Sequence, residues 1–221
     1  MKTFLLSGGL AIAALAVGLS GCNSSSSKTT PAAPAAPTPP PIAQQIVPNP
    51  LPSLTVSSTT FTAGGTLPAT TIFNSFGCTG GDQSPQLSWT AGPAGTVSYA
   101  VTIFDPNAPT NVGFWHWLVY NVPAGTTSLP ANIPVTGAAG GAGSGALPAG
   151  ALQAMDDYGI EGYGGPCPPA GGGTHNYIFT VTALSAMITG LTPATTDAAL
   201  LQFNMDGIIL ARGQVVGTFG R

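Results

Sequence analysis

Residues 98–110 read SYAVTIFDPNAPT, a run of β-branched and aromatic residues that stops at an aspartate and two prolines. This composition is typical of a β-strand, and Asp and Pro favour a turn directly after it. Similar short runs, closed by Gly or Pro, recur along the chain. The strands expected from them are residues 54–57, 86–89, 98–104, 115–120, 176–183 and 213–218. Because no helices alternate with these strands, the sequence predicts an antiparallel β-sandwich and not a parallel sheet.

Helices are expected to be few, because the 221 residues include 31 Gly and 22 Pro. Only a turn around 66–73 and a short helix over 194–204 have helical character. Thr192 as the N-cap and Pro193 as the first helical residue suit a helix start. The expected class is therefore all-β, with one or two short helices.

Charge is scarce in this chain, with 4 Lys+Arg, 7 Asp+Glu and a net charge of −3. Charged residues make up 5% of the chain, against roughly 25% in an average soluble domain. A nucleic-acid partner is excluded by this composition, because neutralising phosphates requires clustered Lys and Arg. A hydrophobic content of 43% is sufficient for a folded core.

Residues 1–21 have the pattern of a signal peptide, with Lys2 ahead of an almost wholly apolar stretch that is short for a membrane span. Leu19-Ser20-Gly21-Cys22 resembles the lipobox of bacterial lipoproteins, in which the cysteine is lipidated. An ordinary secretory signal and an uncleaved anchor are the alternatives. We expect an exported, membrane-anchored lipoprotein with its domain in the periplasm or at the cell surface. Asn23 after the cysteine favours the outer membrane.

Residues 22–52 are rich in Ser, Ala and Pro and lack the large apolar side chains that a core needs. Proline keeps such a segment extended, so we expect a tether between the lipid anchor and a single domain over residues 53–221.

Three cysteines are present, and Cys22 is assigned to the lipobox. In an exported protein the remaining pair, Cys78 and Cys167, is expected to form a disulfide. A zinc site is the alternative, with His116 and His175 as further ligands, but no Cys-x-x-Cys spacing supports it. No metal and no cofactor are expected.

Two further stretches carry residue types suited to binding. In WHWLVYN (115–121), strand alternation is expected to send His116, Leu118 and Tyr120 to one face and both Trp residues to the other. In the stretch from 157 to 177, His175 and Tyr177 are expected to share a face. Taken singly, such residues have ordinary explanations, because an Asp before Pro is commonly a turn former and a His among aromatics commonly lies in a core.

Together, these stretches closely resemble the phosphatidylethanolamine-binding protein family, in its bacterial Raf-kinase-inhibitor-like branch. The matching stretches are FGCTGGD with SP (76–82 and 84–85), DPNAPT (105–110), WHWLVYNVPA (115–124), DYGIEGYGGPCPP (157–169), HNYIFTVTAL (175–184) and LARGQVVGTFGR (210–221). The resemblance covers residues 53–221. It implies a Greek-key β-sandwich with a small pocket at one end that accepts phosphate-like anions and phospholipid head groups.

The resemblance also implies the residues of this pocket. They are Asp105, Pro109, His116, Gly165, Pro168, Pro169, His175 and Tyr177. Two imidazole N–H groups and a phenol O–H can bind an anion without Lys or Arg, and Asp105 would orient one imidazole. Asn176 replaces the Arg common in the family after the second His, so weak anion binding is expected. Affinity should rise as pH falls from 7 to 6 if imidazole must be protonated.

The expected function is therefore that of a membrane-anchored binding protein for a small anion, phosphoester or phospholipid head group. The alternative is a protein-interaction module that inhibits a kinase or protease partner. Enzymatic activity is not expected, because the chain lacks a G-x-S-x-G nucleophile elbow and no spacing supports a Ser-His-Asp set.

Overall fold

A computed structural model describes residues 51–136 and 143–221. The expected signal peptide and the tether, up to residue 50, lie outside the described residues. Within them, none of the helices combines the length and the apolar character needed to cross a bilayer.

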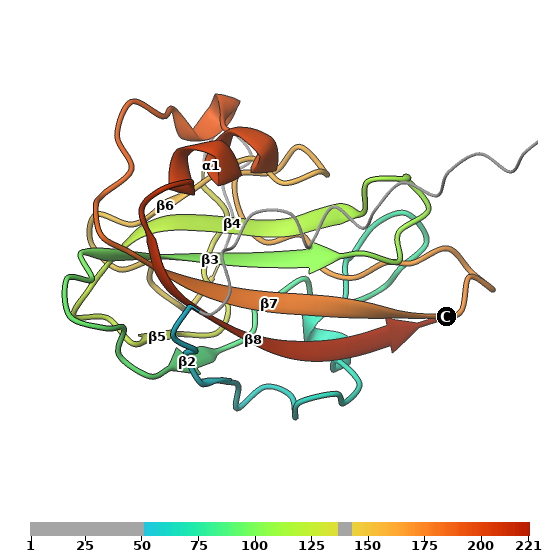
Figure 1. Cartoon of the computed structure of the whole chain (residues 1–221). Coiled ribbons are helices and arrows are strands. Elements are labelled where there is room, and N and C mark those ends of the chain that lie inside the picture. The colour runs from blue at the N-terminus through green and yellow to red at the C-terminus, as the bar shows by residue number, and fades with distance from the viewer. Residues whose placement is uncertain (1–50, 137–142) are drawn as a thin grey trace, which may run out of the picture. The chain divides into compact units, whose positions relative to one another are not determined.

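Two antiparallel sheets form the domain (Figure 1). The smaller has the order β1-β2-β5, with β1 Val56–Ser57, β2 Leu87–Trp89 and β5 Ser128–Leu129. The larger has the order β6-β4-β3-β7-β8, with β6 Leu152–Gln153, β4 Phe114–Pro123, β3 Ser98–Asp105, β7 Thr174–Leu184 and β8 Ile209–Gly220. β7 returns by a long connection to pair with β3, as in a Greek key. The predicted β-sandwich is confirmed, and β5 and β6 are added to the expected strands.

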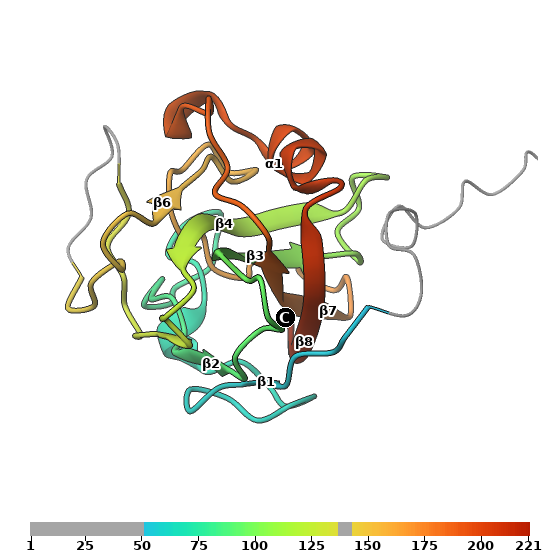
Figure 2. The ribbon, with the colours of Figure 1, turned by 60° about the vertical axis from the view of Figure 1, so that its left-hand side comes forward.

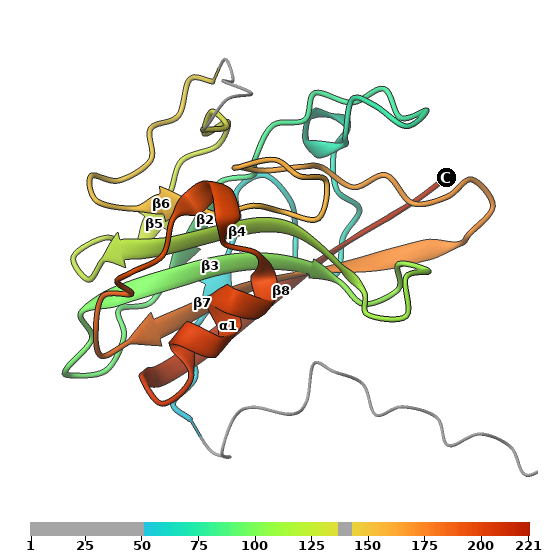
Figure 3. The ribbon, with the colours of Figure 1, turned by 90° about the horizontal axis from the view of Figure 1, so that it is seen from above.

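Both faces of the five-stranded sheet are covered (Figure 2). The inner face packs on the small sheet through a large apolar core that includes Trp89, Tyr99 and Trp117. The outer face packs under the helix α1 (Ala198–Met205), through a smaller cluster that includes Leu118 and Leu201. Seen from above, α1 lies across β7 and β8 (Figure 3). Function can therefore reside at the ends of the strands or between α1 and the sheet.

A β-bulge in β4 changes the faces that the sequence predicted. Ile103 pairs with Trp117 and Phe104 pairs with Trp115, so His116 is the additional residue on β4. Trp117 therefore lies in the inner core, whereas Trp115 packs with the helix-side cluster. The expectation that both Trp residues share a face is wrong, because a bulge interrupts the alternation of a strand by one residue.

The helix also begins later than predicted. Thr192 and Pro193 start a 3₁₀ turn, η4 (Pro193–Thr195), in which the Thr192 side chain makes no capping bond. The N-cap of α1 is Asp197, whose carboxylate accepts a hydrogen bond from Leu200 N at 2.8 Å. The chain is extended at Thr196, which separates the two turns. A second 3₁₀ turn, η2 (Ala69–Thr71), lies in the segment predicted as a turn.

Candidate binding site

Asp105 and His175 form a buried pair at one end of the sandwich. Asp105 ends β3 and His175 lies at the start of β7, and both are less than 5% exposed. His175 Nδ1 lies 2.6 Å from Asp105 Oδ2, and Asn107 N donates to Asp105 Oδ1 at 2.8 Å. The carboxylate therefore holds the imidazole with Nδ1 as donor, and Nε2 of His175 has no hydrogen-bond partner among the described residues.

His116 lies at the β4 bulge and is attached to the Gly-Pro-rich loop. Its Nδ1 is 2.8 Å from the Gly164 carbonyl oxygen, and Gly164 N donates back to the His116 carbonyl at 2.9 Å. Because Nδ1 donates to a carbonyl, Nε2 of the neutral ring is an acceptor. Burial lowers the pKa of the His116 imidazole to about 4, against the opposing effect of the Gly164 carbonyl. His116 is therefore neutral at pH 7, and the expectation of two donating imidazoles is wrong for this residue.

Tyr177 lies between the two imidazoles. Its ring centroid is 5.2 Å from that of His116 and 6.5 Å from that of His175. Its O–H is buried and has no hydrogen-bond partner among the described residues. Burial raises the pKa of the phenol, so the group stays protonated and can donate. Buried polar atoms are normally paired, so the Tyr177 hydroxyl retains an unused donor beside the two imidazoles. We call Asp105, His116, His175 and Tyr177 the imidazole cluster.

The loop over 164–169 closes one side of the imidazole cluster. Gly165 N donates to Asp82 Oδ1 at 2.7 Å, and a Cβ at Gly165 would meet the Thr71 carbonyl oxygen at 2.3 Å, so only glycine fits. Pro168 is buried, whereas Pro169 is exposed. Pro109, on the loop after β3, is also exposed. Of the two prolines predicted for the site in this loop, only Pro168 is buried in the protein.

A disulfide and an arginine hold this loop in place. Cys78 and Cys167 are bonded, as predicted, which leaves neither sulfur as a thiolate for zinc. Arg221 donates to the carbonyl oxygens of Pro168, Gly77 and Phe76 at 2.6, 2.7 and 3.2 Å. These bonds occupy its guanidinium, so Arg221 anchors the loop. Among the described residues, no group of three or more His, Cys, Asp or Glu is arranged to hold a metal ion.

Aromatic residues form a further wall that sequence reasoning left out of the site. The Tyr158 ring lies 4.1 Å from Phe73, 4.6 Å from Phe114 and 5.6 Å from His116, measured between centroids. The Tyr158 hydroxyl donates to the Gly165 carbonyl at 3.2 Å. The sequence could have indicated Tyr158 as a site residue, because it lies in the stretch from 157 to 177 that was singled out. Phe73 had no such signal.

Asp156, beside the loop, is a buried carboxyl whose charge is suppressed. Its Oδ1 accepts from Ile160 N at 2.7 Å, and its Oδ2 has no partner among the described residues. Burial raises the pKa of Asp156 to about 8, so this carboxyl is mostly protonated at pH 7. It therefore contributes little negative charge against an anion bound nearby.

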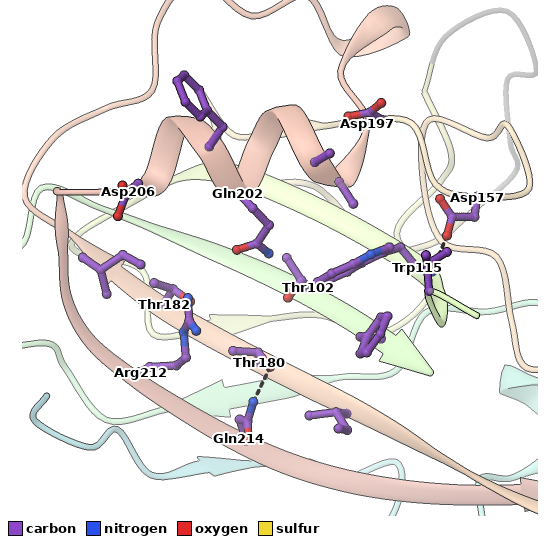
Figure 4. A pocket seen from close by; sticks show the side chains of 17 residues that line it. Thr102, Trp115, Asp157, Thr180, Thr182, Asp197, Gln202, Asp206, Arg212 and Gln214 are labelled. Atoms are coloured by element: carbon purple, nitrogen blue, oxygen red, sulfur yellow. Dashed lines mark hydrogen bonds between the residues drawn. The ribbon is translucent and has the colours of Figure 1, made fainter. Parts of the chain in front are cut away.

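A groove of about 600 Å³ lies elsewhere, between α1 and the outer face of the five-stranded sheet (Figure 4). No member of the imidazole cluster lines it. We call it the outer groove. The sequence-based site thus corresponds to a tight cluster of buried side chains, and the outer groove was not predicted.

Comparison with known proteins places these observations in a family. A family model described as phosphatidylethanolamine-binding protein matches residues 57–220. Escherichia coli YbcL is 46% identical over 129 residues, which are 58% of this chain and 67% of YbcL. Escherichia coli YbhB is 41% identical over 156 residues, which are 71% of this chain and 93% of YbhB.

A solved structure of YbcL and one further relative complete the comparison. The crystal structure of Escherichia coli YbcL matches with a TM-score of 0.69 and 36% identity, covering 76% of this chain and 99% of that one. A Mycobacterium tuberculosis protein named "Putative lipoprotein LppC" is 33% identical over 168 residues, which are 75% of this chain and 72% of LppC.

Proposed function

The chain belongs to the phosphatidylethanolamine-binding protein family, and from that premise we propose that its imidazole cluster binds a small anion, a phosphoester or a phospholipid head group. The observation that carries the proposal is the buried, unpaired hydroxyl of Tyr177 between two imidazoles whose Nδ1 atoms are already bonded. The groups left for a ligand are one phenol donor and the Nε2 atoms of His116 and His175.

The neutral state of His116 narrows the class of ligand that the cluster can bind. A neutral imidazole with Nδ1 as donor offers only a lone pair at Nε2. A fully deprotonated phosphate would meet that lone pair without a hydrogen. A ligand that carries both an anionic oxygen and an O–H or N–H donor satisfies Tyr177 and His116 together. Phosphoethanolamine and singly protonated phosphate have this combination.

The experiment is a titration of phosphoethanolamine and of inorganic phosphate, at pH 6 and pH 8, followed by the imidazole NMR signals. Tyr177→Phe removes the hydroxyl and keeps the ring, and it should weaken binding about tenfold, as for a hydrogen bond to a charged group. Tyr120→Phe is the matched control, because Tyr120 also has a buried, unpaired hydroxyl but packs on the helix side of the sheet. If neither imidazole signal moves at millimolar ligand, the proposal fails.

Export and anchoring are the second part of the proposal. The lipobox-like Leu19–Cys22 and the name of the relative LppC support a lipidated Cys22 that attaches the domain to a membrane, with Asn23 favouring the outer membrane. Cys22→Ala should move the protein from the membrane fraction to the soluble periplasmic fraction. An unchanged distribution would refute lipidation at this residue.

A further inference from the structure

The outer groove has the size and the lining of a ligand site. Its volume of about 600 Å³ falls within the range of small-molecule sites, roughly 300–1,000 Å³. Its floor consists of outward side chains of β3, β7 and β8, and α1 covers one side (Figure 4). Val112 and Phe203 also line it and are 59% and 78% exposed, so large apolar side chains meet water there.

Arg212 supplies positive charge at one end of the outer groove. Its Nε donates to Thr182 Oγ1 at 3.2 Å, and no described carboxylate forms a salt bridge with it, including Asp206 in the same groove. Burial lowers the pKa of this guanidinium, yet an arginine stays charged at neutral pH. A partly buried cation without a counter-ion is unfavourable. An anion from outside would remove that cost.

The opposite end of the outer groove is apolar and aromatic. The rings of Phe104 and Trp115 lie 4.5 Å apart between centroids, and Ile178 lies opposite Phe104 in the sheet. Figure 4 shows Arg212 beside Thr182 at one end and Trp115 toward the other. Along β7, Ile178 and Thr182 are four residues apart, which corresponds to about 13 Å at roughly 3.3 Å per residue.

Polar side chains also line the groove between its two ends, namely Thr102, Thr180, Gln202 and Gln214. Gln214 Nε2 donates to Thr180 Oγ1 at 3.0 Å, so these two side chains pair with each other. An apolar chain can therefore cross this part of the floor without breaking their hydrogen bond. Asp157 and Asp197 lie at the aromatic side and accept hydrogen bonds from Trp115 N and Leu200 N. Their charges disfavour an anion there. Asp206 is a third carboxylate of the lining and lies toward the Arg212 end, so the attraction of a carboxylate to this groove depends on the Arg212 guanidinium alone.

We infer that the outer groove binds an amphipathic monocarboxylate, whose carboxylate pairs with Arg212 and whose apolar chain extends about 13 Å along β7 to Phe104 and Trp115. The carboxylate becomes the missing counter-ion, and the chain covers apolar surface that is now exposed to water. This site is separate from the imidazole cluster and does not depend on the function proposed for it.

The test is isothermal titration calorimetry of the full chain with dodecanoate, kept below its micellar concentration. We expect saturable binding of one dodecanoate per chain. Arg212→Gln should weaken it about tenfold or more, because a charge-assisted contact is lost. Arg212→Lys keeps the positive charge in the groove and should retain more of the affinity than Arg212→Gln. Ala199→Trp places a large ring in the groove from an exposed helical position, and it should abolish binding.

The ligand's charge and a second signal complete the test. Dodecyltrimethylammonium has the same chain with a positive end, and it should bind at least tenfold more weakly than dodecanoate. The indole NMR signal of Trp115 should shift with dodecanoate in the wild type and in Tyr177→Phe alike. The inference is overturned by a lack of saturable dodecanoate binding, by equal affinity of the two surfactants, or by unchanged affinity in either Arg212→Gln or Ala199→Trp.

Discussion

The imidazole cluster and the outer groove lie on opposite faces of one sheet, and they differ in how polar atoms are held. In the cluster, Nδ1 of each imidazole is hydrogen-bonded to a protein oxygen, and the loop over 164–169 closes one side. In the outer groove, Thr180 pairs with Gln214 and Thr182 with Arg212, and the guanidinium has no carboxylate partner among the described residues. A compact polar ligand suits the cluster, whereas a long ligand with one charged end suits the groove.

The two regions also differ in what supports them. The cluster depends on loops that are held by the Cys78–Cys167 disulfide, by Arg221 and by Asp82. The groove is formed mainly by paired strands and by α1, whose cap is Asp197. Changes that release a loop should therefore affect the cluster first, and changes in α1 should affect only the groove.

The largest expected effect comes from removing the disulfide. Cys78 and Cys167 are 89 residues apart, and the chain-entropy model gives about 4–5 kcal/mol for a loop of this length. The double variant Cys78→Ser, Cys167→Ser should lose roughly this free energy of unfolding in guanidinium denaturation. Where it still folds, the imidazole signals of the cluster should broaden while the Trp115 signal stays sharp. A decrease in the free energy of unfolding of less than about 1 kcal/mol would show that the disulfide is not a main source of stability.

The next effect is a loss of stability in acid that arises from His116. Its folded pKa, about 4, lies below the unfolded value near 6.5. The unfolded state therefore binds the proton first, and stability that is present above pH 6.5 is lost as pH falls toward 4. The loss should approach about 3 kcal/mol.

His116→Asn tests this effect, because Asn keeps an N–H donor near the Gly164 carbonyl but does not titrate in this range. Urea denaturation from pH 7 to pH 4 should show a flatter decline than in the wild type. An equally steep decline in both proteins would show that His116 is not the group responsible.

The smallest effect concerns the cap of α1. Asp197→Ala should lower the free energy of unfolding by about 1 kcal/mol, because the bond to Leu200 N is lost. Thr192→Ala is the matched control and should have little effect, since its side chain makes no capping bond. Thermal denaturation of both variants measures the difference. The imidazole signals should be the same in both, and the opposite order of stabilities would restore Thr192 as the cap.

Much of the fold could be predicted from the sequence, because β-branched and aromatic runs between Gly and Pro identify strands without knowledge of their partners. The predicted 98–104 and 176–183 differ from β3 and β7 only at their ends. β5 and β6 were not predicted, because neither of these two-residue strands lies in a longer run of β-branched and aromatic residues. The start of α1 was misplaced, because Thr192-Pro193 and Asp197 are both plausible starts and the extended Thr196 between them is a tertiary feature.

The candidate site was predictable as a set of residues but not as a chemical arrangement. The motifs identified Asp105, His116, His175 and Tyr177, and the structure places these four side chains in contact with one another through one pair and two ring contacts. The roles of the two imidazoles were not predictable, since they depend on burial and on partners up to 70 residues away. The local sequence does not show how deeply a side chain is buried, and burial sets the pKa of His116.

By itself, the sequence determined the β-sandwich class and the family, because composition, strand runs and motifs can be recognised locally. It indicated the pairing of Cys78 with Cys167 only through the count of cysteines that remain after Cys22. Only the tertiary structure decided that His116 sits on a bulge as a neutral acceptor, and that Arg212 faces a groove with no salt-bridge partner among the described residues. Bulges, desolvation and unpaired charges depend on which distant segments pack together. The sum of those non-local contacts decides what each polar side chain can do.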